Sequence, residues 1–252
     1  MNTRLIRSLP VLIALLSPVA FGAGLPSAAS LLDQFIERSG GIAAYAKAKN
    51  VEMTGTVEIA GKNISGRISM AEEGGKAWTS MDLPGIGRIE QGYDGDVAWE
   101  MNAIQGARLI EGDEKSAVKR ASSFSAIATW RDEYKDAITS SEETVEGTRA
   151  WKVVMTPKEG RPETFYFDQQ SMMLIRMTTV SSTPLGDIPA DVLMSDYRPV
   201  NGIMTAFTVT QKAMGQSIVM KFEKITYNAS LPKGRFDLPV AVKALVAKRP
   251  AP

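Results

Sequence analysis

Methionines in strand-like segments are the residues whose type and spacing point most clearly to a chemistry. The sequence has 13 methionines. Most fall where apolar and polar residues alternate: Met53, Met70, Met81, Met101, Met155, Met172, Met173, Met177, Met194, Met204 and Met220. Methionine is flexible and polarizable, so it suits surfaces that accept differently shaped apolar partners. The set predicts noncovalent binding of an apolar ligand, although any single methionine fits an ordinary core position slightly better.

Apolar residues on the predicted strands are the candidates for lining such a ligand site. Two tryptophans among them would border the cavity. The candidates are Met53, Val57, Ile68, Met70, Met81, Trp99, Met101, Trp151, Phe165, Met194, Phe207 and Met220. Each buried methylene contributes about 0.8 kcal/mol. A long acyl chain could therefore be held by burial alone.

The absence of histidine and cysteine excludes many kinds of catalytic site. The chain has neither residue, so a Ser-His-Asp triad, a Cys-His pair, a thiolate metal site and a disulfide are impossible. Paired carboxylates would remain as a route to hydrolysis. The candidate pairs Glu72-Glu73 and Glu142-Glu143 are adjacent in sequence, so on strands their side chains would point to opposite faces. We expect solvated surface there and predict no catalytic residue, metal or cofactor.

Two further charged clusters are better explained by surface structure than by a site. The acidic run at 94–100 lacks the ligand spacing of a calcium loop and fits a hairpin turn. Lys115, Lys119 and Arg120 could meet an acidic partner or lipid head groups, but a solvated helix face explains them better.

Residues 1–23 have the pattern of a secretory signal peptide. Arg4 and Arg7 precede an apolar run at 9–21 and small residues at 22–24. The run is shorter than the roughly 20 residues that cross a bilayer, and an uncleaved anchor is the alternative. We expect export to the periplasm. Without these two of the 29 basic residues, against 28 acidic ones, the net charge becomes about −1, which offers no basic stripe for nucleic acid.

The periodicity of the mature chain predicts a mainly β, α+β fold. Helical spacing over 30–48, starting at a Ser30 cap and broken at Gly40-Gly41, precedes period-two segments from Val51 onward. One or two helices are expected over 113–137, and strands then resume to Tyr227. We count about eleven strands in sequential hairpins. An antiparallel sheet of that size tends to curl, which predicts a half-open barrel with helices over its concave face. A β-sandwich is the main alternative.

Four short motifs resemble those of the periplasmic lipoprotein-carrier family with the LolA/LolB-like fold. They are Gly92–Trp99 (GYDGDVAW), Phe165–Asp168 (FYFD), Asp196–Arg198 before Asn201–Ile203, and Phe236–Pro239 (FDLP). The resemblance implies an eleven-stranded half-open barrel, a helical lid and a hydrophobic cavity for acyl chains. It also implies a lipid or lipidated protein as partner, together with membrane-associated donor and acceptor proteins.

These observations predict a single ligand-binding domain over 24–239, a flexible tail over 240–252 and a monomer. We expect a periplasmic carrier that sequesters a lipid, a lipoprotein or another apolar ligand. The alternative is an envelope protein-interaction or stress-sensing module whose own side chains fill the cavity. A hydrolase acting through carboxylates is a distant third.

Overall fold

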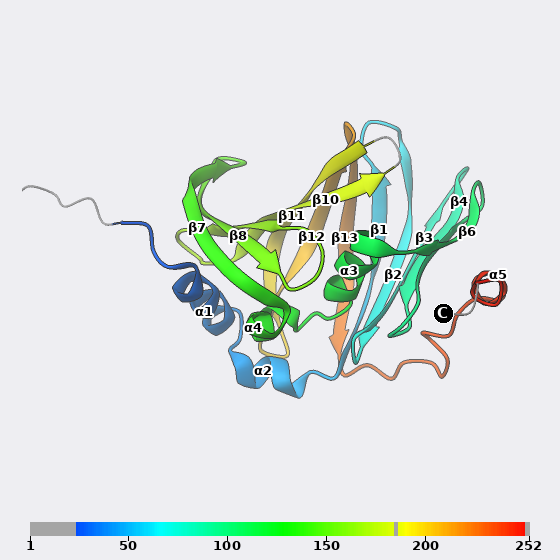
Figure 1. Cartoon of the computed structure of the whole chain (residues 1–252), viewed down its shortest axis with the longest axis horizontal. Coiled ribbons are helices and arrows are strands. Elements are labelled where there is room, and N and C mark those ends of the chain that lie inside the picture. Colours follow the sequence, from blue (N-terminus) through cyan, green and yellow to red (C-terminus); the bar gives the residue numbers. More distant parts are fainter. Residues whose placement is uncertain (1–23, 184–185, 250–252) are drawn as a thin grey trace, which may run out of the picture.

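Thirteen strands form one antiparallel sheet in the computed structural model, which describes residues 24–183 and 186–249 (Figure 1). The predicted signal peptide, residues 1–23, lies outside the described residues. The strands are β1 (Asn50–Ile59), β2 (Ile64–Glu73), β3 (Lys76–Leu83), β4 (Gly87–Tyr93), β5 (Ala98–Asn102), β6 (Gly106–Ile110), β7 (Tyr134–Val145), β8 (Thr148–Pro157), β9 (Glu163–Asp168), β10 (Leu174–Thr183), β11 (Gly186–Val200), β12 (Ile203–Ala213) and β13 (Gln216–Tyr227).

The spatial order of the strands makes two meandering arms that meet at the middle of the sheet. The order is β6-β5-β4-β3-β2-β1-β13-β12-β11-β10-β9-β8-β7, so β6 and β7 lie at the two ends. The first and last strands of the chain pair with each other, with Val51 opposite Tyr227 and Val57 opposite Met220. Gly55 lies at a register shift in this pair, and a Cβ there would be 2.1 Å from the Lys221 carbonyl oxygen. Only glycine fits that close approach.

The mainly β, antiparallel fold class is confirmed, but the predicted number of strands was too low. β6 is only five residues long, and no strand was predicted there. No strand was predicted over β7 either, and its start was predicted to be helical because Trp130 and Tyr134 are four residues apart. That spacing brings side chains to one side of a helix and equally to one face of a strand. The helical insert therefore ends at Glu133, and not at 137 as predicted.

Two helices precede the sheet, as the spacing over 30–48 predicts. They are α1 (Ala28–Arg38) and α2 (Ile42–Lys47). The N-cap of α1 is Ser27, whose Oγ accepts a hydrogen bond from the Ser30 amide at 3.2 Å, so the cap predicted at Ser30 was three residues late. Leu31, Leu32, Phe35 and Ile36 form the buried side of α1.

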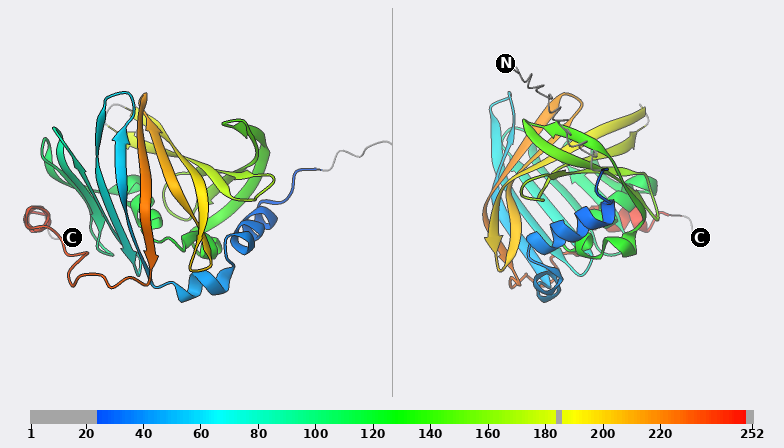
Figure 2. Two further views of the ribbon diagram at one scale, coloured as in Figure 1. Left: turned by 180° about the vertical axis from the view of Figure 1, so that it is seen from behind. Right: turned by 90° about the vertical axis from the view of Figure 1, so that its left-hand side faces the viewer.

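Between the two arms, the chain crosses one face of the sheet through three short helices. These are α3 (Gly112–Ala121), the 3-10 helix η1 (Ala126–Thr129) and α4 (Trp130–Glu133). We call the face that they cover the inner face; Ile68, Met81 and Phe165 lie on it. Figure 2 shows α1 and the insert on this side of the sheet.

The inner face carries two large groups of packed apolar residues. Around one arm, α1 packs against β8 and β9, with the rings of Phe35 and Phe167 5.6 Å apart. Around the centre, α2 and the insert pack against β1, β2, β12 and β13, where Val57 and Ile68 are almost fully buried. Together these groups anchor the helices to the sheet.

A last helix, α5 (Val240–Val246), packs on the outer face near β6 (Figure 1). Its Val242 is completely buried against Val97 and Trp99. Residues 240–246, expected to belong to a flexible tail, are therefore ordered by apolar packing in this structure. Among the described residues, no helix is long and apolar enough to cross a membrane.

Candidate functional site

A cavity of about 690 Å³ lies between the helical insert and the inner face of the sheet. The sheet contributes from positions far apart in the strand order: Met81 and Ile89 from β3 and β4, and Phe165 and Met177 from β9 and β10. Met81 is the cross-strand partner of Ile89, and Phe165 is that of Met177. Because cross-strand partners point to the same face, each pair presents a continuous apolar surface to the cavity.

The helical insert forms the opposite wall of the cavity. Ala117, Val118 and Ala121 of α3 line it, followed by Phe124 and Ile127. None of the α3 residues is fully buried. The helix therefore covers the cavity without a large apolar contact of its own.

A buried ion pair holds the C-terminal end of α3 against β9. The Arg120 guanidinium donates to Glu163 Oε1 through Nη2 at 2.5 Å and Nε at 3.1 Å, and through Nη1 to the Glu159 carbonyl at 2.7 Å. The Arg120 and Glu163 side chains are each only 8% exposed. Tyr134 donates its hydroxyl proton to Glu163 Oε2 at 2.6 Å. Burial, reinforced by the Glu163 carboxylate, raises the pKa of Tyr134 well above its usual value, so Tyr134 remains a donor.

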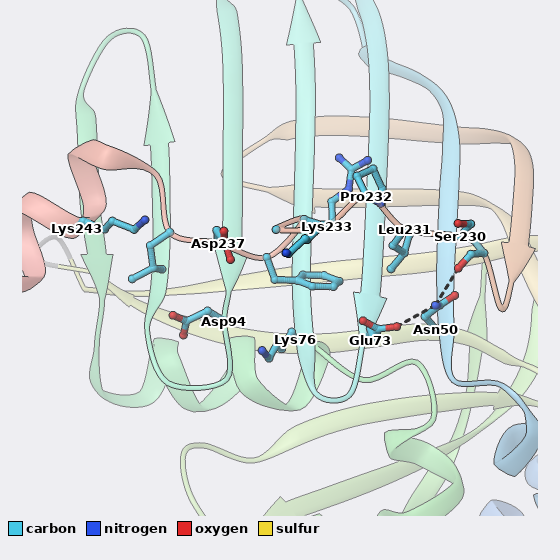
Figure 3. A pocket seen from close by; sticks show the side chains of 15 residues that line it. Asn50, Glu73, Lys76, Asp94, Ser230, Leu231, Pro232, Lys233, Asp237 and Lys243 are labelled. Carbon is cyan, nitrogen blue, oxygen red and sulfur yellow. Dashed lines mark hydrogen bonds between the residues drawn. The ribbon is translucent and has the colours of Figure 1, made fainter.

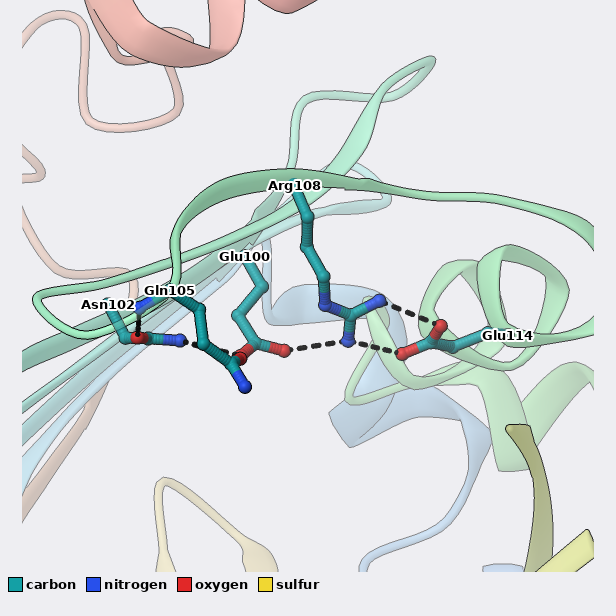
Figure 4. Close-up of polar contacts among 5 residues, drawn as sticks. All are labelled: Glu100, Asn102, Gln105, Arg108 and Glu114. Carbon is teal, nitrogen blue, oxygen red and sulfur yellow. Dashed lines mark hydrogen bonds and ion pairs between the residues drawn. The ribbon is translucent and has the colours of Figure 1, made fainter. Parts of the chain in front are cut away.

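A second ion pair holds the N-terminal end of α3 against β5 and β6 (Figure 4). Arg108 of β6 binds both Glu114 carboxylate oxygens, at 3.0 and 2.7 Å, and Glu100 Oε2 at 2.8 Å. Hydrogen bonds to Glu114, with a further contribution from Glu100, raise the pKa of Arg108 above its already high value. Glu100 and Glu114 both line the cavity. The arginine therefore neutralises part of the negative charge at this rim.

Glu72 is buried on the inner face beside the insert, contrary to the solvated position predicted for it. Its side chain accepts a hydrogen bond from the Phe124 backbone amide, and burial raises its pKa to about 7. Its Oε2 atom is buried without a hydrogen-bond partner among the described residues. Glu73, its neighbour in sequence, is exposed and accepts a hydrogen bond from Asn50. The two carboxylates face apart, as expected for adjacent strand residues.

Arg120 is a second charged residue whose environment was predicted wrongly from the sequence. We predicted a solvated helix face for Lys115, Lys119 and Arg120, but Arg120 points inward to the buried Glu163. Lys115 lies 3.7 Å from Asp96. The sequence gave no signal for the Arg120–Glu163 pair because 43 residues separate its members.

Ten of the candidate ligand-binding residues belong to the apolar groups of the inner face, but only two of these ten line the cavity. Met81 and Phe165 are the two that do. Trp151 and Met194 pack with the group around Phe165. Packed in the central group, beside Met81, are Met53, Val57, Ile68, Met70, Phe207 and Met220.

Trp99 and Met101 lie on the outer face and do not line the cavity. Glu100 between them points to the cavity, and alternate strand residues point to opposite faces. Trp99 is 2% exposed and packs with Val242 of α5. Its ring also covers Gly92, where a Cβ would be 2.6 Å from Trp99 Cζ2. Trp99, predicted to border the cavity, and Met101, predicted to bind the ligand, therefore both lie away from this cavity.

The lining residues of the insert were absent from the candidate set, although the sequence held a signal for them. Ala117, Val118, Ala121 and Phe124 recur at helical spacing, which marks one apolar side of a helix. No ligand-binding role was assigned to these residues. In the structure it faces the cavity.

A second hollow, of about 790 Å³, lies beneath the chain segment that follows β13 (Figure 3). Its lining mixes basic and acidic side chains, among them Lys76, Lys243, Asp94 and Asp237. Asn50 at its edge donates to Glu73 at 3.0 Å and to the Ala229 carbonyl at 3.1 Å. This polar hollow offers no continuous apolar wall. In the described part of the chain, no three acidic side chains are grouped as a metal site.

No protein-family model and no curated protein matches this sequence. Solved structures do match its fold. A DUF1329 family protein from Desulfovibrio piger has a TM-score of 0.55 at 14% identity, covering 83% of this chain and 97% of that one. A LolA superfamily protein from Nitrosomonas europaea has a TM-score of 0.55 at 11% identity, covering 85% and 99%.

A third match is a domain from Vibrio parahaemolyticus described as a putative outer membrane lipoprotein-sorting protein. It has a TM-score of 0.53 at 14% identity and covers 82% of this chain and 97% of that one. Identities this low establish shared architecture only. The predicted resemblance is confirmed at that level: the chain has the fold of the LolA superfamily.

Proposed function

We propose that this protein binds an apolar ligand, such as an acyl chain of a lipid or a lipidated protein, in the cavity beneath α3. The observation that carries the proposal is the 690 Å³ cavity with apolar residues on both walls. Its volume is within the range of about 300–1,000 Å³ that small-molecule sites occupy. Burial of methylene groups would supply the affinity.

The sheet would act in this function as a half-open barrel with the helices over its concave face. Strands β3 and β4 in one arm and β9 and β10 in the other contribute to a single cavity. Because residues of both arms line the same cavity, the two arms would face one bound ligand, and this supports the half-open barrel. Movement of α3 would then open the cavity for loading and release.

The carrier role extends the proposal to location and partners. The signal peptide pattern at residues 1–23 supports export to the periplasm. A ligand held by burial needs a donor and an acceptor at membranes, because it would not leave spontaneously into water. We propose that the protein works as a monomer, as a single ligand-binding domain over 24–239, between such membrane-associated partners.

Native mass spectrometry of protein purified without detergent tests ligand binding. We expect a co-purifying lipid at close to one molecule per chain, identifiable after organic extraction. In Met177→Lys the charge would enter the apolar wall, and retained lipid should fall about tenfold or more. Ile138→Lys is the matched control, because Ile138 is 58% exposed and outside the cavity; its lipid content should equal that of the wild type.

An empty wild-type protein that also ignores added lipids would contradict the carrier proposal. Equal lipid loss in the Met177 and Ile138 variants would show that binding occurs elsewhere. In the first case, affinity capture of a protein partner would test the interaction-module alternative.

A further inference from the structure

We propose that the cavity selects against ligands with a free carboxylate and accepts chains whose polar end is uncharged or cationic. This inference rests on the proposed function, since it assigns the chemical class of the ligand. It would favour acyl chains held in ester or amide linkage, and long-chain amines, over free fatty acids. The argument depends on the charged groups that line the cavity.

Carboxylates outnumber cations in the cavity lining. The charged lining residues are Glu100, Glu114, Arg120, Glu133 and Glu163. Even when Arg108, which binds Glu100 and Glu114 from outside the lining, is included, the group retains an excess of negative charge. A ligand carboxylate at the polar end would therefore meet like charge.

Both arginines of this group are already paired with protein carboxylates. Arg120 is 8% exposed, and each of its three guanidinium nitrogens already donates to Glu163 or to the Glu159 carbonyl. Both terminal nitrogens of Arg108 are engaged by Glu114 and Glu100. Protein carboxylates thus already balance the charge of both arginines, and a ligand carboxylate would have to compete with them.

Two lysines beside the cavity do not change this balance. Lys119 and Lys158 line an adjoining cleft of about 170 Å³ that shares Arg120 and Glu133 with the cavity, and Asp132 and Glu159 line the same cleft and match their charge. Lys158 also donates to the Asp132 carbonyl at 2.6 Å. An anion entering the apolar cavity would lose water without gaining a partner, which is unfavourable. An ammonium group would instead meet carboxylates, and an ester would carry no charge to desolvate. Selection therefore comes from rejection of the wrong charge as well as from apolar contact.

The test compares three ligands with the same twelve-carbon chain on the full mature protein. Monododecanoylglycerol, dodecylamine and dodecanoate, each below its aggregation concentration, compete with the uncharged probe N-phenyl-1-naphthylamine at about pH 7.5, where the amine and the acid are both charged. We expect dodecanoate to bind about tenfold or more weakly than the other two. The difference should shrink as salt screens the charges.

A double variant tests whether the rim carboxylates cause the selection. Glu100→Gln with Glu114→Gln would free the Arg108 guanidinium, and the affinity for dodecanoate relative to that for monododecanoylglycerol should then rise by about fivefold or more. Glu223→Gln is the control, because Glu223 pairs with Arg67 on an exposed surface away from the cavity.

Equal or tighter binding of dodecanoate to the wild-type protein would overturn the inference, and so would an unchanged preference in the double variant. Both results leave the proposed function intact as long as monododecanoylglycerol displaces the probe. Failure of all three ligands and of the probe to bind would instead overturn the proposed function.

Discussion

Glu72 is the residue whose environment departs furthest from what its type would suggest. It lies in a strand two positions after Met70, on the same inner face, and the Phe124 amide is its hydrogen-bond donor. Tyr227, whose pKa burial raises, is close enough for the Glu72 charge to contribute to that shift. The Glu72 carboxylate connects β2 to the segment after α3 through this hydrogen bond. Because the carboxylate is buried, its charged form lowers the stability of the folded protein.

This destabilisation predicts a specific dependence of stability on pH. The pKa of Glu72 is raised from 4.5 to about 7 in the folded protein, so the folded state binds its proton more tightly than the unfolded state does. The Glu72 contribution to stability is therefore greatest below pH 4.5, falls as the pH rises to about 7 and is constant above that. The total change is about 3 kcal/mol.

Glu72→Gln should remove this slope and raise the free energy of unfolding above pH 7, measured by urea denaturation across the pH range. Glu58→Gln, at an exposed position of β1, should leave the profile unchanged. A Glu72→Gln profile that keeps the wild-type slope between pH 4.5 and 7 would show that another group titrates.

Among the elements, α3 depends on ion pairs at both ends because it lacks buried residues. Replacing one member of the buried pair leaves a buried charge without its partner. Arg120→Met should therefore lower the free energy of unfolding by about 3–4 kcal/mol. The double variant Arg120→Met with Glu163→Gln should recover a large part of that loss.

The comparison pair for this experiment is the exposed contact between Arg131 and Asp33, whose side chains are 57% and 54% exposed. Arg131→Met should cost much less than Arg120→Met, because water screens exposed pairs. Denaturation curves of the three variants give the free energies of unfolding that this prediction compares. If Arg131→Met and Arg120→Met are equally destabilising, burial is not the source of the effect.

The α5 helix makes a stability prediction of its own. Val242→Ala would leave a space beside Trp99, and we expect a loss of about 2 kcal/mol with a change in tryptophan fluorescence. Val240 is 85% exposed in the same helix, so Val240→Ala should change stability by less than about 0.5 kcal/mol. Similar effects of the two substitutions would mean that α5 is not packed in solution.

The elements differ in how well the sequence predicted them, and local chemistry explains the difference. The turn at Asp94-Gly95 was predictable because Asp94 Oδ1 accepts from the amides of Asp96 and Val97, at 2.9 and 2.7 Å. Such contacts lie within a few residues of sequence. The start of β7 was not predictable because Tyr134 fits a helical and a strand period equally well. The place of α5 depends on Trp99, which is distant in sequence.

At the scale of the whole molecule, the sequence predicted the sheet and the inner face better than the site. Period-two alternation placed Val57, Ile68 and Phe207 on one face, where the structure has them packed together. Alternation alone does not tell which face the helices cover, so Trp99 was assigned to the wrong one. The cavity also depends on α3, whose C-terminal end is held by the Arg120–Glu163 pair, and 43 residues separate these two partners in sequence.

The pairing of β1 with β13 has a consequence for how the chain reaches its final form. Val51 and its partner Tyr227 are 176 positions apart in sequence (227 − 51), and the central group of buried residues includes residues from both of these strands. A polypeptide that emerges from a ribosome or a translocation pore with its N-terminus first cannot close this seam until β13 has emerged. Pairings this distant in sequence slow folding, so the sheet would be completed only after the last strand has been synthesised.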